Sequence, residues 1–324
     1  MSDHDAGRSC PLHYRYRARD LAAPASDHCE VLYVVGGLYG NVQALHRVIN
    51  LFEHERGVKR MVFNGDFHWF DVDPRAFAQI QRGVLAFDAT RGNVETELAA
   101  PASSHGVDAG CGCAYPDWVD DGVVERSNRI LTRLRDTASA VAGACDALQA
   151  LPMWRRIDVG ECRVAIVHGD AQSLSGWGFA QESLRDAAAR RVAAQWFVQA
   201  EVDVFASSHT CLPVFQALGD GLLLNNGAAG MPNLAGAREG LLTRIAVHPF
   251  AGSQRRFGVR RDQAHHELHL DAIAIDYDDD AWRGSFLAQW PPGSDAHTSY
   301  WARISEGTDY RFDDAVRVGA ATGA

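Results

Sequence analysis

Long apolar runs are missing from this sequence of 324 residues. Its first thirty residues are polar and contain no apolar core of the kind that a signal peptide has. No later run reaches the roughly 20 apolar residues that a membrane-spanning helix needs. We therefore expect a cytoplasmic protein without a membrane partner.

Basic residues are also in short supply, with 31 Lys and Arg against 41 Asp and Glu and a net charge of -10. A surface of this sign repels nucleic acid, so no nucleic-acid-binding surface is expected. An anionic substrate would need a local cation or a metal ion to offset the same field. The charge balance therefore favours a metal site over a basic patch.

Cysteines are few and scattered. The seven of them, an odd number in a long chain, do not resemble a disulfide framework, which indicates a reducing compartment and a packing role. Cys111 and Cys113 lie in a segment of small residues, glycines and acids at about 99–124, which is typical of an inserted loop. Their thiolates could reach a neighbouring site. Because no second close pair completes a zinc spacing, we interpret them as incidental.

What the sequence does contain is a repeated order of strand, glycine turn and helix. A β-rich run at residues 31–35 ends in two glycines and is followed by apolar residues with helical spacing. A second unit has a strand at 61–63, the turn Gly65-Asp66 and another helix. Residues 84–87 are predicted to form the next strand, which leads to Gly92-Asn93. This alternation is typical of an α/β fold.

The rest of the chain continues with alternating predicted helices and strands, and its last part contains predicted strands without helices between them. Helices are expected over 125–151 and 181–201, and strands over 162–167, 202–206, 222–224, 241–247 and 268–277. A hydrophobic content of 47% is enough for a sizeable core. With no clear boundary, we expect residues 31–324 to form a single domain and residues 1–30 to be an N-terminal extension on its surface.

Four potential metal ligands each follow a predicted strand directly. They are Asp66, Asn93, His168 and His209. Carboxylate, amide and imidazole groups all bind divalent metals, and the carboxyl ends of strands in open α/β sheets are where ligands collect. A lone histidine is usually a packing residue, but four ligands at four strand ends indicate a metal site.

The order of these motifs resembles that of the calcineurin-like metallophosphoesterases, in which Asp-x-His, Gly-Asp, Gly-Asn, a single His and Gly-His-x-His precede an Asn-x-Gly turn. The matching stretches from the second motif on are Gly65-Asp66, Gly92-Asn93, His168-Gly169-Asp170, Ser208-His209-Thr210-Cys211 and Asn225-Asn226-Gly227. The resemblance implies a β-sandwich core flanked by helices. It also implies a small phosphorylated substrate, either a phosphomonoester or a phosphodiester, and two metal ions bridged by Asp66.

The departures from the family pattern concentrate on one of the two metal positions. The first-motif Asp and His fall on Gly37 and Tyr39, and the last His falls on Cys211. The resemblance gives the other position a full set of ligands: Asp66, Asn93, His168 and His209. It therefore implies one complete site for a divalent ion (Mn, Fe, Zn or Mg), with a hole at Gly37 and a second ion only if another donor compensates. The family's frequent catalytic His is also absent, because Val94 stands there.

Three further residues are candidates for the same pocket. Tyr39 can form hydrogen bonds, but an ordinary phenol pKa near 10 makes it a poor ligand. Cys211 could bind zinc or iron as a thiolate, yet Asp66 and Cys211 alone are fewer ligands than catalytic zinc usually has. His68, close after Asp66, could orient or replace a ligand, or could be part of an ordinary loop.

The leading hypothesis is a metal-dependent phosphoesterase with one complete metal site. The alternative is a catalytically impaired relative that binds one metal ion and a phosphorylated ligand. A nucleotide-binding protein of the Rossmann type is disfavoured, because residues 36–40 lack the Gly-x-Gly-x-x-Gly spacing. No feature of the sequence specifies an oligomeric state.

Overall fold

The computed structural model describes residues 6–99, 109–263 and 267–318. One of its two sheets has the strand order β11-β12-β10-β2-β3-β4. The neighbours β2, β3 and β4 run parallel, and β10 pairs with β2 in the antiparallel direction. In chain order, the strands are β2 (Val31–Val35), β3 (Lys59–Asn64), β4 (Asp88–Thr90), β10 (Gly240–Ala246), β11 (Arg255–Asp262) and β12 (Glu267–Ile275).

The other sheet has the order β1-β5-β6-β7-β9-β8-β13. Its centre consists of β6, β7 and β9, which are parallel to one another. In chain order, the strands are β1 (Asp27–Cys29), β5 (Trp154–Val159), β6 (Cys162–Val167), β7 (Val204–Ser207), β8 (Pro213–Leu218), β9 (Gly221–Asn226) and β13 (Val316–Arg317).

The two sheets pack face to face and share an apolar core. Leu32 and Val62 from the first sheet and Val164 and Val204 from the second belong to this core, and all four are fully buried. Such packing explains why the central strands are apolar along their whole length, since their outer faces are covered as well. The α/β fold with a β-sandwich core flanked by helices is therefore confirmed.

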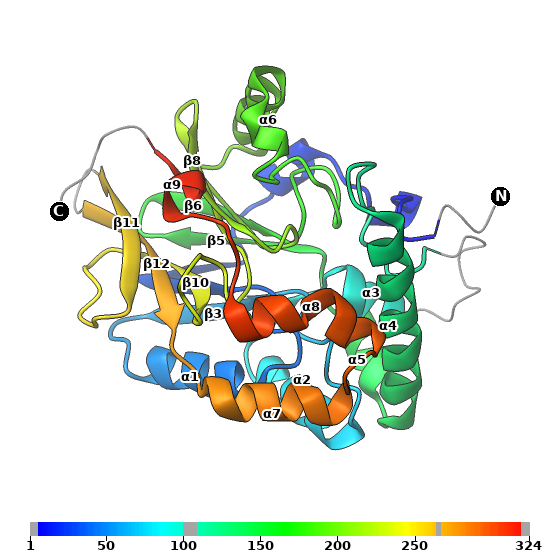
Figure 1. The fold of residues 1–324 in the computed structure, drawn as a ribbon. Helices are drawn as coiled ribbons and strands as arrows, with labels where there is room; N and C mark the ends of the chain where they lie inside the picture. Colours follow the sequence, from blue (N-terminus) through cyan, green and yellow to red (C-terminus); the bar gives the residue numbers. More distant parts are fainter. Residues whose placement is uncertain (1–5, 100–108, 264–266, 319–324) are drawn as a thin grey trace.

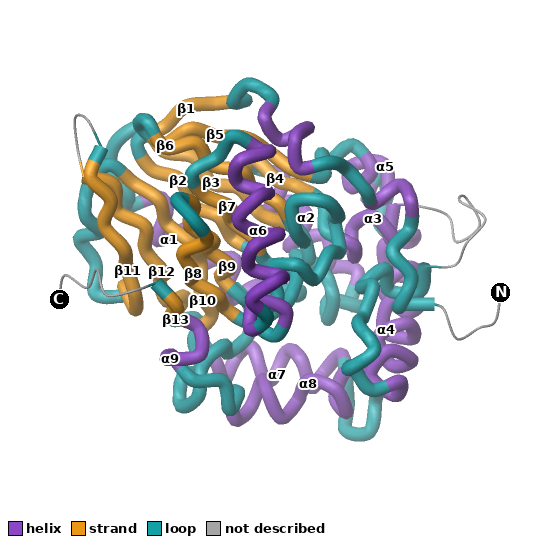
Figure 2. Tube along the Cα trace, turned by 90° about the horizontal axis from the view of Figure 1, so that it is seen from above, coloured by secondary structure: helices purple, strands orange, loops and turns teal. Residues whose placement is uncertain are grey.

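Helices cover the outer faces of both sheets. In Figure 1, α1 (Val42–Glu53), α2 (Pro74–Leu85) and α7 (Asp279–Gln289) lie on one side of the strands, and α6 (Ala187–Ala200) lies on the other. The remaining helices are α3 (Asn93–Ala99), α4 (Asp121–Ala140), α5 (Ala144–Gln149), α8 (Asp295–Glu306) and α9 (Phe312–Ala315). Figure 2 shows α4 beside one end of the strands. None of the helices in the described ranges is both long and apolar enough to cross a bilayer.

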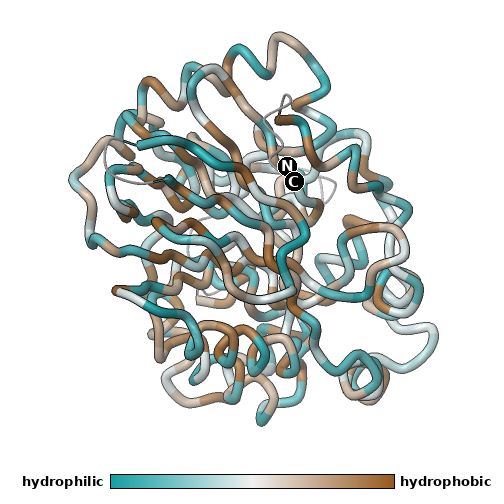
Figure 3. Tube along the Cα trace, turned by 90° about the vertical axis from the view of Figure 1, so that its left-hand side faces the viewer, coloured by the Kyte–Doolittle hydropathy of each residue, from teal (hydrophilic) through white to brown (hydrophobic). Residues whose placement is uncertain are grey.

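The local sequence explains why α1 begins and which face it buries. The Asn41 side chain accepts a hydrogen bond from the backbone N–H of Ala44, which caps the helix. Leu45 and Val48 lie on the face that packs into the core. Hydrophobic and hydrophilic residues alternate in the same way along much of the chain (Figure 3).

Several elements differ from the sequence-based prediction. Residues 84–87 are not a strand, because Val84 and Leu85 complete α2 and the strand β4 begins only at Asp88. A short apolar run gives no periodicity by which to distinguish the end of a helix from a strand. After β12 the chain forms α7 and α8, which the sequence pattern had not indicated.

Residues 6–30, before β2, contribute buried side chains and a strand to the packed fold. Tyr14 and Leu21 are completely buried, and β1 pairs with β5. Tyr14 donates a hydrogen bond to the Glu97 carboxylate at 2.6 Å. These contacts join residues more than 80 positions apart, so the polar composition of the segment could not reveal them. The domain boundaries expected from the sequence stay a prediction.

Candidate metal site

The topology of the two sheets explains why the four strand-end residues meet. Asp66 follows β3, Asn93 follows β4 and begins α3, His168 follows β6, and His209 follows β7. β3 and β4 are parallel neighbours in one sheet, as are β6 and β7 in the other. Parallel neighbours end at the same edge, and the sandwich brings these two edges together.

The four side chains converge around the Nε2 atom of His168. That atom lies 3.3 Å from Asp66 Oδ1, 3.2 Å from Asn93 Oδ1 and 3.2 Å from His209 Nδ1. The potential ligand atoms of Asp66, His168 and His209 all lie within 4.8 Å of one another. All four residues are buried. The expected convergence on one point is therefore present, while the role of these residues as metal ligands stays a prediction.

Three backbone carbonyls fix which atoms of these side chains face the centre. His168 Nδ1 is 2.8 Å from the Asn64 carbonyl oxygen, and His209 Nε2 is 3.1 Å from that of Cys113. Because a carbonyl oxygen only accepts, each of these ring nitrogens must carry the hydrogen. The Asn93 amide nitrogen likewise donates to the Cys111 carbonyl at 2.9 Å, which turns its Oδ1 inward.

The consequence is a cluster of lone pairs that face one another. With both imidazoles neutral, His168 Nε2, His209 Nδ1, Asn93 Oδ1 and the Asp66 carboxylate have no hydrogen among them. Such an arrangement is stable only when a cation or a proton occupies the centre. Two imidazole nitrogens and two oxygens form a donor set that suits zinc, iron or manganese. The residues present therefore fit a divalent metal ion.

The charges at the site support the same assignment. Burial, together with neighbouring His168, lowers the pKa of His209 to about 4, so this imidazole is neutral near pH 7 with a free lone pair. Burial opposes charge on His168 and Asp66, but their mutual attraction dominates, raising the pKa of His168 and lowering that of Asp66. The Asp66 carboxylate thus favours a positive charge between itself and the His168 imidazole. A divalent cation supplies more positive charge there than a proton does.

Glu95 fixes the turn that presents Asp66, a role that the sequence analysis missed. Asp66 has a left-handed backbone with φ of 52°, which is uncommon outside glycine. The buried Glu95 carboxylate accepts hydrogen bonds from the backbone N–H groups of Asp66 and Gly92, both at 2.8 Å, and from that of Phe67 at 3.0 Å. The signal for it was an acidic residue two positions after Asn93.

We expect Glu95→Gln to destabilise the protein while conserving side-chain size. The amide has only one acceptor oxygen, so at least one of these backbone N–H groups loses its partner in a buried place. Each buried donor left unpaired costs about 1–3 kcal/mol, which should appear as a lower free energy of unfolding in urea. Glu53→Gln, on the exposed side of α1, is the matched control. Equal urea midpoints for the two variants would show that the Glu95 contacts contribute nothing.

The space beside Gly37, where the resemblance implies a second metal position, is filled by the Tyr39 side chain. A Cβ atom added to Gly37 would lie 2.6 Å from Cε2 of the Tyr39 ring. The expected hole at Gly37 is therefore wrong, because Tyr39 occupies the space. The Tyr39 hydroxyl lies 2.8 Å from Cys211 Sγ. Burial, with Cys211 and Asp66 nearby, raises the pKa of Tyr39 well above its ordinary value, so the phenol keeps its proton in this structure.

His68 does not line the pocket that the sequence placed it in. Its ring stacks on Phe77 with centroids 3.7 Å apart, and its Nδ1 atom lies 2.6 Å from the Asp71 carboxylate. His68 and Asp71 are both fully buried. The chain continues past Asp66 into a packed turn, so proximity in sequence did not bring His68 to the site.

A small cavity of about 190 Å³ opens at Asp66, Asn93 and His209. Tyr39 and Cys211 line it, as the sequence suggested. The loop of Cys111 and Cys113 is not incidental to the site, because its carbonyls orient Asn93 and His209 and Cys113 lines the cavity. Four aromatic lining residues were missed by sequence reasoning, and they come from separate segments: Trp69, Tyr115, Trp177 and Tyr300.

No known protein family and no curated protein matches this sequence. Solved structures do match the fold. A hypothetical protein from Pyrococcus horikoshii aligns over 86% of this chain and 99% of its own, with a TM-score of 0.55 and 13% identity. A metallophosphoesterase from Sphaerobacter thermophilus aligns over 86% of this chain and 100% of its own, with a TM-score of 0.52 and 16% identity. The chain has the metallophosphoesterase fold. The expected resemblance therefore extends to the three-dimensional arrangement of this divergent sequence.

Proposed function

We propose that this protein is a metal-dependent phosphoesterase with one metal position, acting on a phosphomonoester or phosphodiester. The observation that supports it best is the convergence of Asp66, Asn93, His168 and His209 on one buried point, where neutral imidazoles would direct their lone pairs toward a shared cation. The metallophosphoesterase fold supports the reaction class. The negative net charge supports it as well, since an anionic substrate needs a cation at the site.

Asp66, Asn93, His168 and His209 would hold the ion, which when bound polarises a phosphoryl oxygen and lowers the pKa of a water molecule. The neighbouring Thr210 hydroxyl accepts a hydrogen bond from the Asn225 amide at 2.8 Å, so its own hydrogen is free to be donated. Thr210 also lines the cavity, where it would bind a phosphoryl oxygen. The aromatic walls exclude bulk water and strengthen these contacts.

A second candidate function is the binding of a phosphorylated ligand without its hydrolysis. Val94 favours it, because this cavity residue has no proton to give to a leaving group. Tyr39 favours it as well, since its ring fills the place beside Gly37 where a second ion would be needed. In this alternative the same ligands hold one ion that binds phosphate but does not turn it over.

Metal analysis combined with a phosphatase assay tests the proposal. The purified protein is stripped with chelator, reconstituted with manganese, iron, zinc or magnesium, and analysed by mass spectrometry for bound metal. We expect about one ion per chain and hydrolysis of 4-nitrophenyl phosphate or its bis ester. One ion with tight phosphate binding and no turnover would favour the second candidate. No retained ion and no hydrolysis would overturn both.

A further inference from the structure

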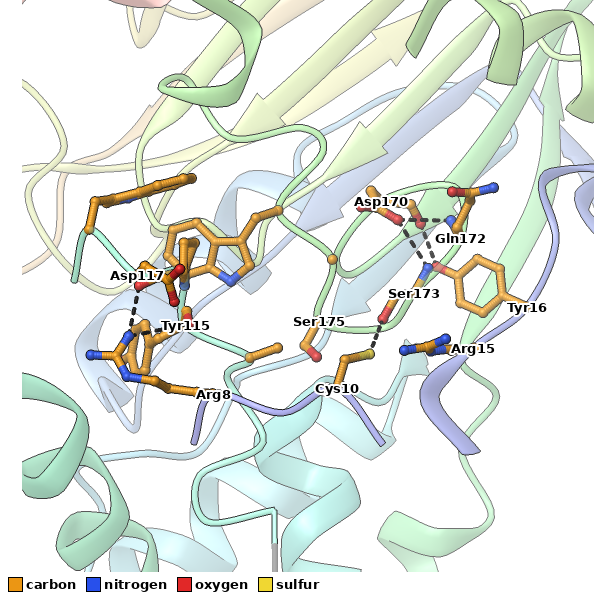
Figure 4. Close-up of a pocket in the computed structure, with 15 residues that line it drawn as sticks. Arg8, Cys10, Arg15, Tyr16, Tyr115, Asp117, Asp170, Gln172, Ser173 and Ser175 are labelled. Carbon is orange, nitrogen blue, oxygen red and sulfur yellow. Dashed lines mark hydrogen bonds between the residues drawn. The ribbon is translucent and has the colours of Figure 1, made fainter. Parts of the chain in front are cut away.

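Figure 4 shows a second and larger cavity, of about 800 Å³, which shares lining residues with the metal cavity. Three segments form it: residues 8–16 near the N-terminus, 114–118 after the Cys111 and Cys113 loop, and 170–177 after His168. Tyr115 and Trp177 line both cavities. We call the larger one the outer cavity.

The volumes of the two cavities indicate that they bind different parts of a substrate. Pockets that enclose a small-molecule ligand usually have about 300–1,000 Å³, so a metal cavity of about 190 Å³ is too small for more than a phosphoryl group and the first atoms attached to it. The outer cavity is within the usual range. A substrate bound through its phosphoryl group would therefore place its organic part past Tyr115 and Trp177.

Aromatic rings dominate the end of the outer cavity nearest to the metal site. Trp177 packs edge-on against His209, with centroids 5.5 Å apart, and Trp118 packs edge-on against Trp177 at 6.3 Å. Trp118 nevertheless keeps 58% of its surface exposed, which is unusual for so large an apolar side chain. Such an exposed ring next to a cavity provides a surface on which a planar ligand can stack.

Two polar groups in the outer cavity have no partner of their own. The Ser175 hydroxyl is fully buried and forms no hydrogen bond with any described residue. Within the same described part of the chain, the exposed Arg15 guanidinium forms no hydrogen bond or ion pair. Of the two, only the exposed Arg15 guanidinium has the accessible surface that contact with a ligand requires, because the Ser175 hydroxyl is fully buried.

The charged residues of the outer cavity indicate which end of it an acidic group of the ligand occupies. Arg8 is already occupied by Asp121 and by backbone carbonyls of the 116–119 segment, and Asp117 adds negative charge at the Tyr115 end. Arg15 lies toward the opposite end in the view of Figure 4, with Ser175 between it and Tyr115. Asp170 also lines the Arg15 end, but its buried carboxylate already accepts hydrogen bonds from the backbone N–H groups of Gln172, Ser173 and Gly178. An acidic group on the ligand is therefore favoured beside the exposed Arg15 and disfavoured beside the exposed Asp117.

We propose that the outer cavity binds the organic group of the substrate, and that this group is an aromatic ring with an acidic substituent at its far end. The inference rests on the proposed function and names its substrate class: aryl phosphate esters with a distal carboxylate or phosphate. The ring stacks on Trp118, and the acid pairs with Arg15.

Three phosphonates that cannot be hydrolysed test this by calorimetry on the manganese-loaded protein. They are propylphosphonate, benzylphosphonate and 4-(phosphonomethyl)benzoate. We expect the ring to tighten binding about tenfold and the carboxylate to add about fivefold more. Trp118→Leu should remove the gain from the ring, and Arg15→Gln only the gain from the carboxylate. Phe312→Leu and Arg191→Gln, two exposed residues away from both cavities, should change neither gain.

A probe without a phosphonate separates this inference from the proposed function. 4-Methylbenzoate should give a saturation-transfer NMR signal even in metal-free protein, and Trp118→Leu or Arg15→Gln should weaken it. If no phosphonate binds but this signal behaves as expected, the proposed function falls and the outer cavity stands as a site for aromatic acids. Equal affinity for the three phosphonates, or gains that persist in both variants, would overturn the inference alone. Absence of every signal would overturn both.

Discussion

Replacing Asp66 or His209 by alanine is expected to abolish hydrolysis and to lower the metal content of the protein at least about tenfold. Each substitution removes one of the three residues that line the metal cavity and also contact His168 Nε2 within 3.3 Å, the third being Asn93. The proposed function gives this chain one metal position, so no second ion would remain to keep a substrate bound. Metal content by mass spectrometry and turnover of 4-nitrophenyl phosphate measure the two effects in the same samples.

Controls separate loss of the ion from loss of the fold. His54→Ala removes an exposed imidazole at the end of α1 and should leave metal content and turnover unchanged. Asp66→Asn keeps a residue type that tolerates the left-handed backbone at this position, so its thermal unfolding should stay close to that of the wild type. If Asp66→Ala and His209→Ala retain a full ion and full turnover, the assignment of these ligands is wrong.

The second large effect is expected from rebuilding the lost metal position. We predict that Gly37→Asp combined with Tyr39→His and Cys211→His raises phosphodiesterase activity by roughly an order of magnitude or more, because a second ion can then share Asp66. Gly37→Asp is expected to be tolerated only together with the substitution of Tyr39. Gly37→Asp alone places its side chain against the Tyr39 ring, 2.6 Å from the new Cβ, so this single variant should unfold more easily by about 1–3 kcal/mol.

Removal of the Tyr39 ring is what creates the space, so the triple variant should recover most of the stability that the single variant loses. Gly37 has φ of 65°, a left-handed backbone that aspartate tolerates better than most residues. Metal content should rise to about two ions per chain at saturating manganese or zinc. A triple variant that binds two ions and stays inactive, beside an inactive wild type, would favour phosphate binding over hydrolysis.

The sequence alone determined the positions of the four candidate ligands. Asp66, His168 and His209 could be recognised because each follows an apolar strand, and parallel strands bring their carboxyl ends to one edge. Asn93 was placed correctly at a strand end although the strand before it, β4, lies at residues 88–90 rather than 84–87. The same periodicity predicted the α/β class and most helices. These features are local, since they depend on residue spacing over a few turns or one strand.

Only the tertiary structure decided what surrounds those ligands. The Tyr39 ring fills the space at Gly37, the carbonyls of Cys111 and Cys113 orient Asn93 and His209, and the segment at residues 8–16 helps to form the outer cavity. Each of these contacts depends on packing, and nearly all of them join residues far apart in the chain. The pattern of a single segment contains no record of which distant segment packs against it, so the ligands were predictable and the shape of the pocket was not.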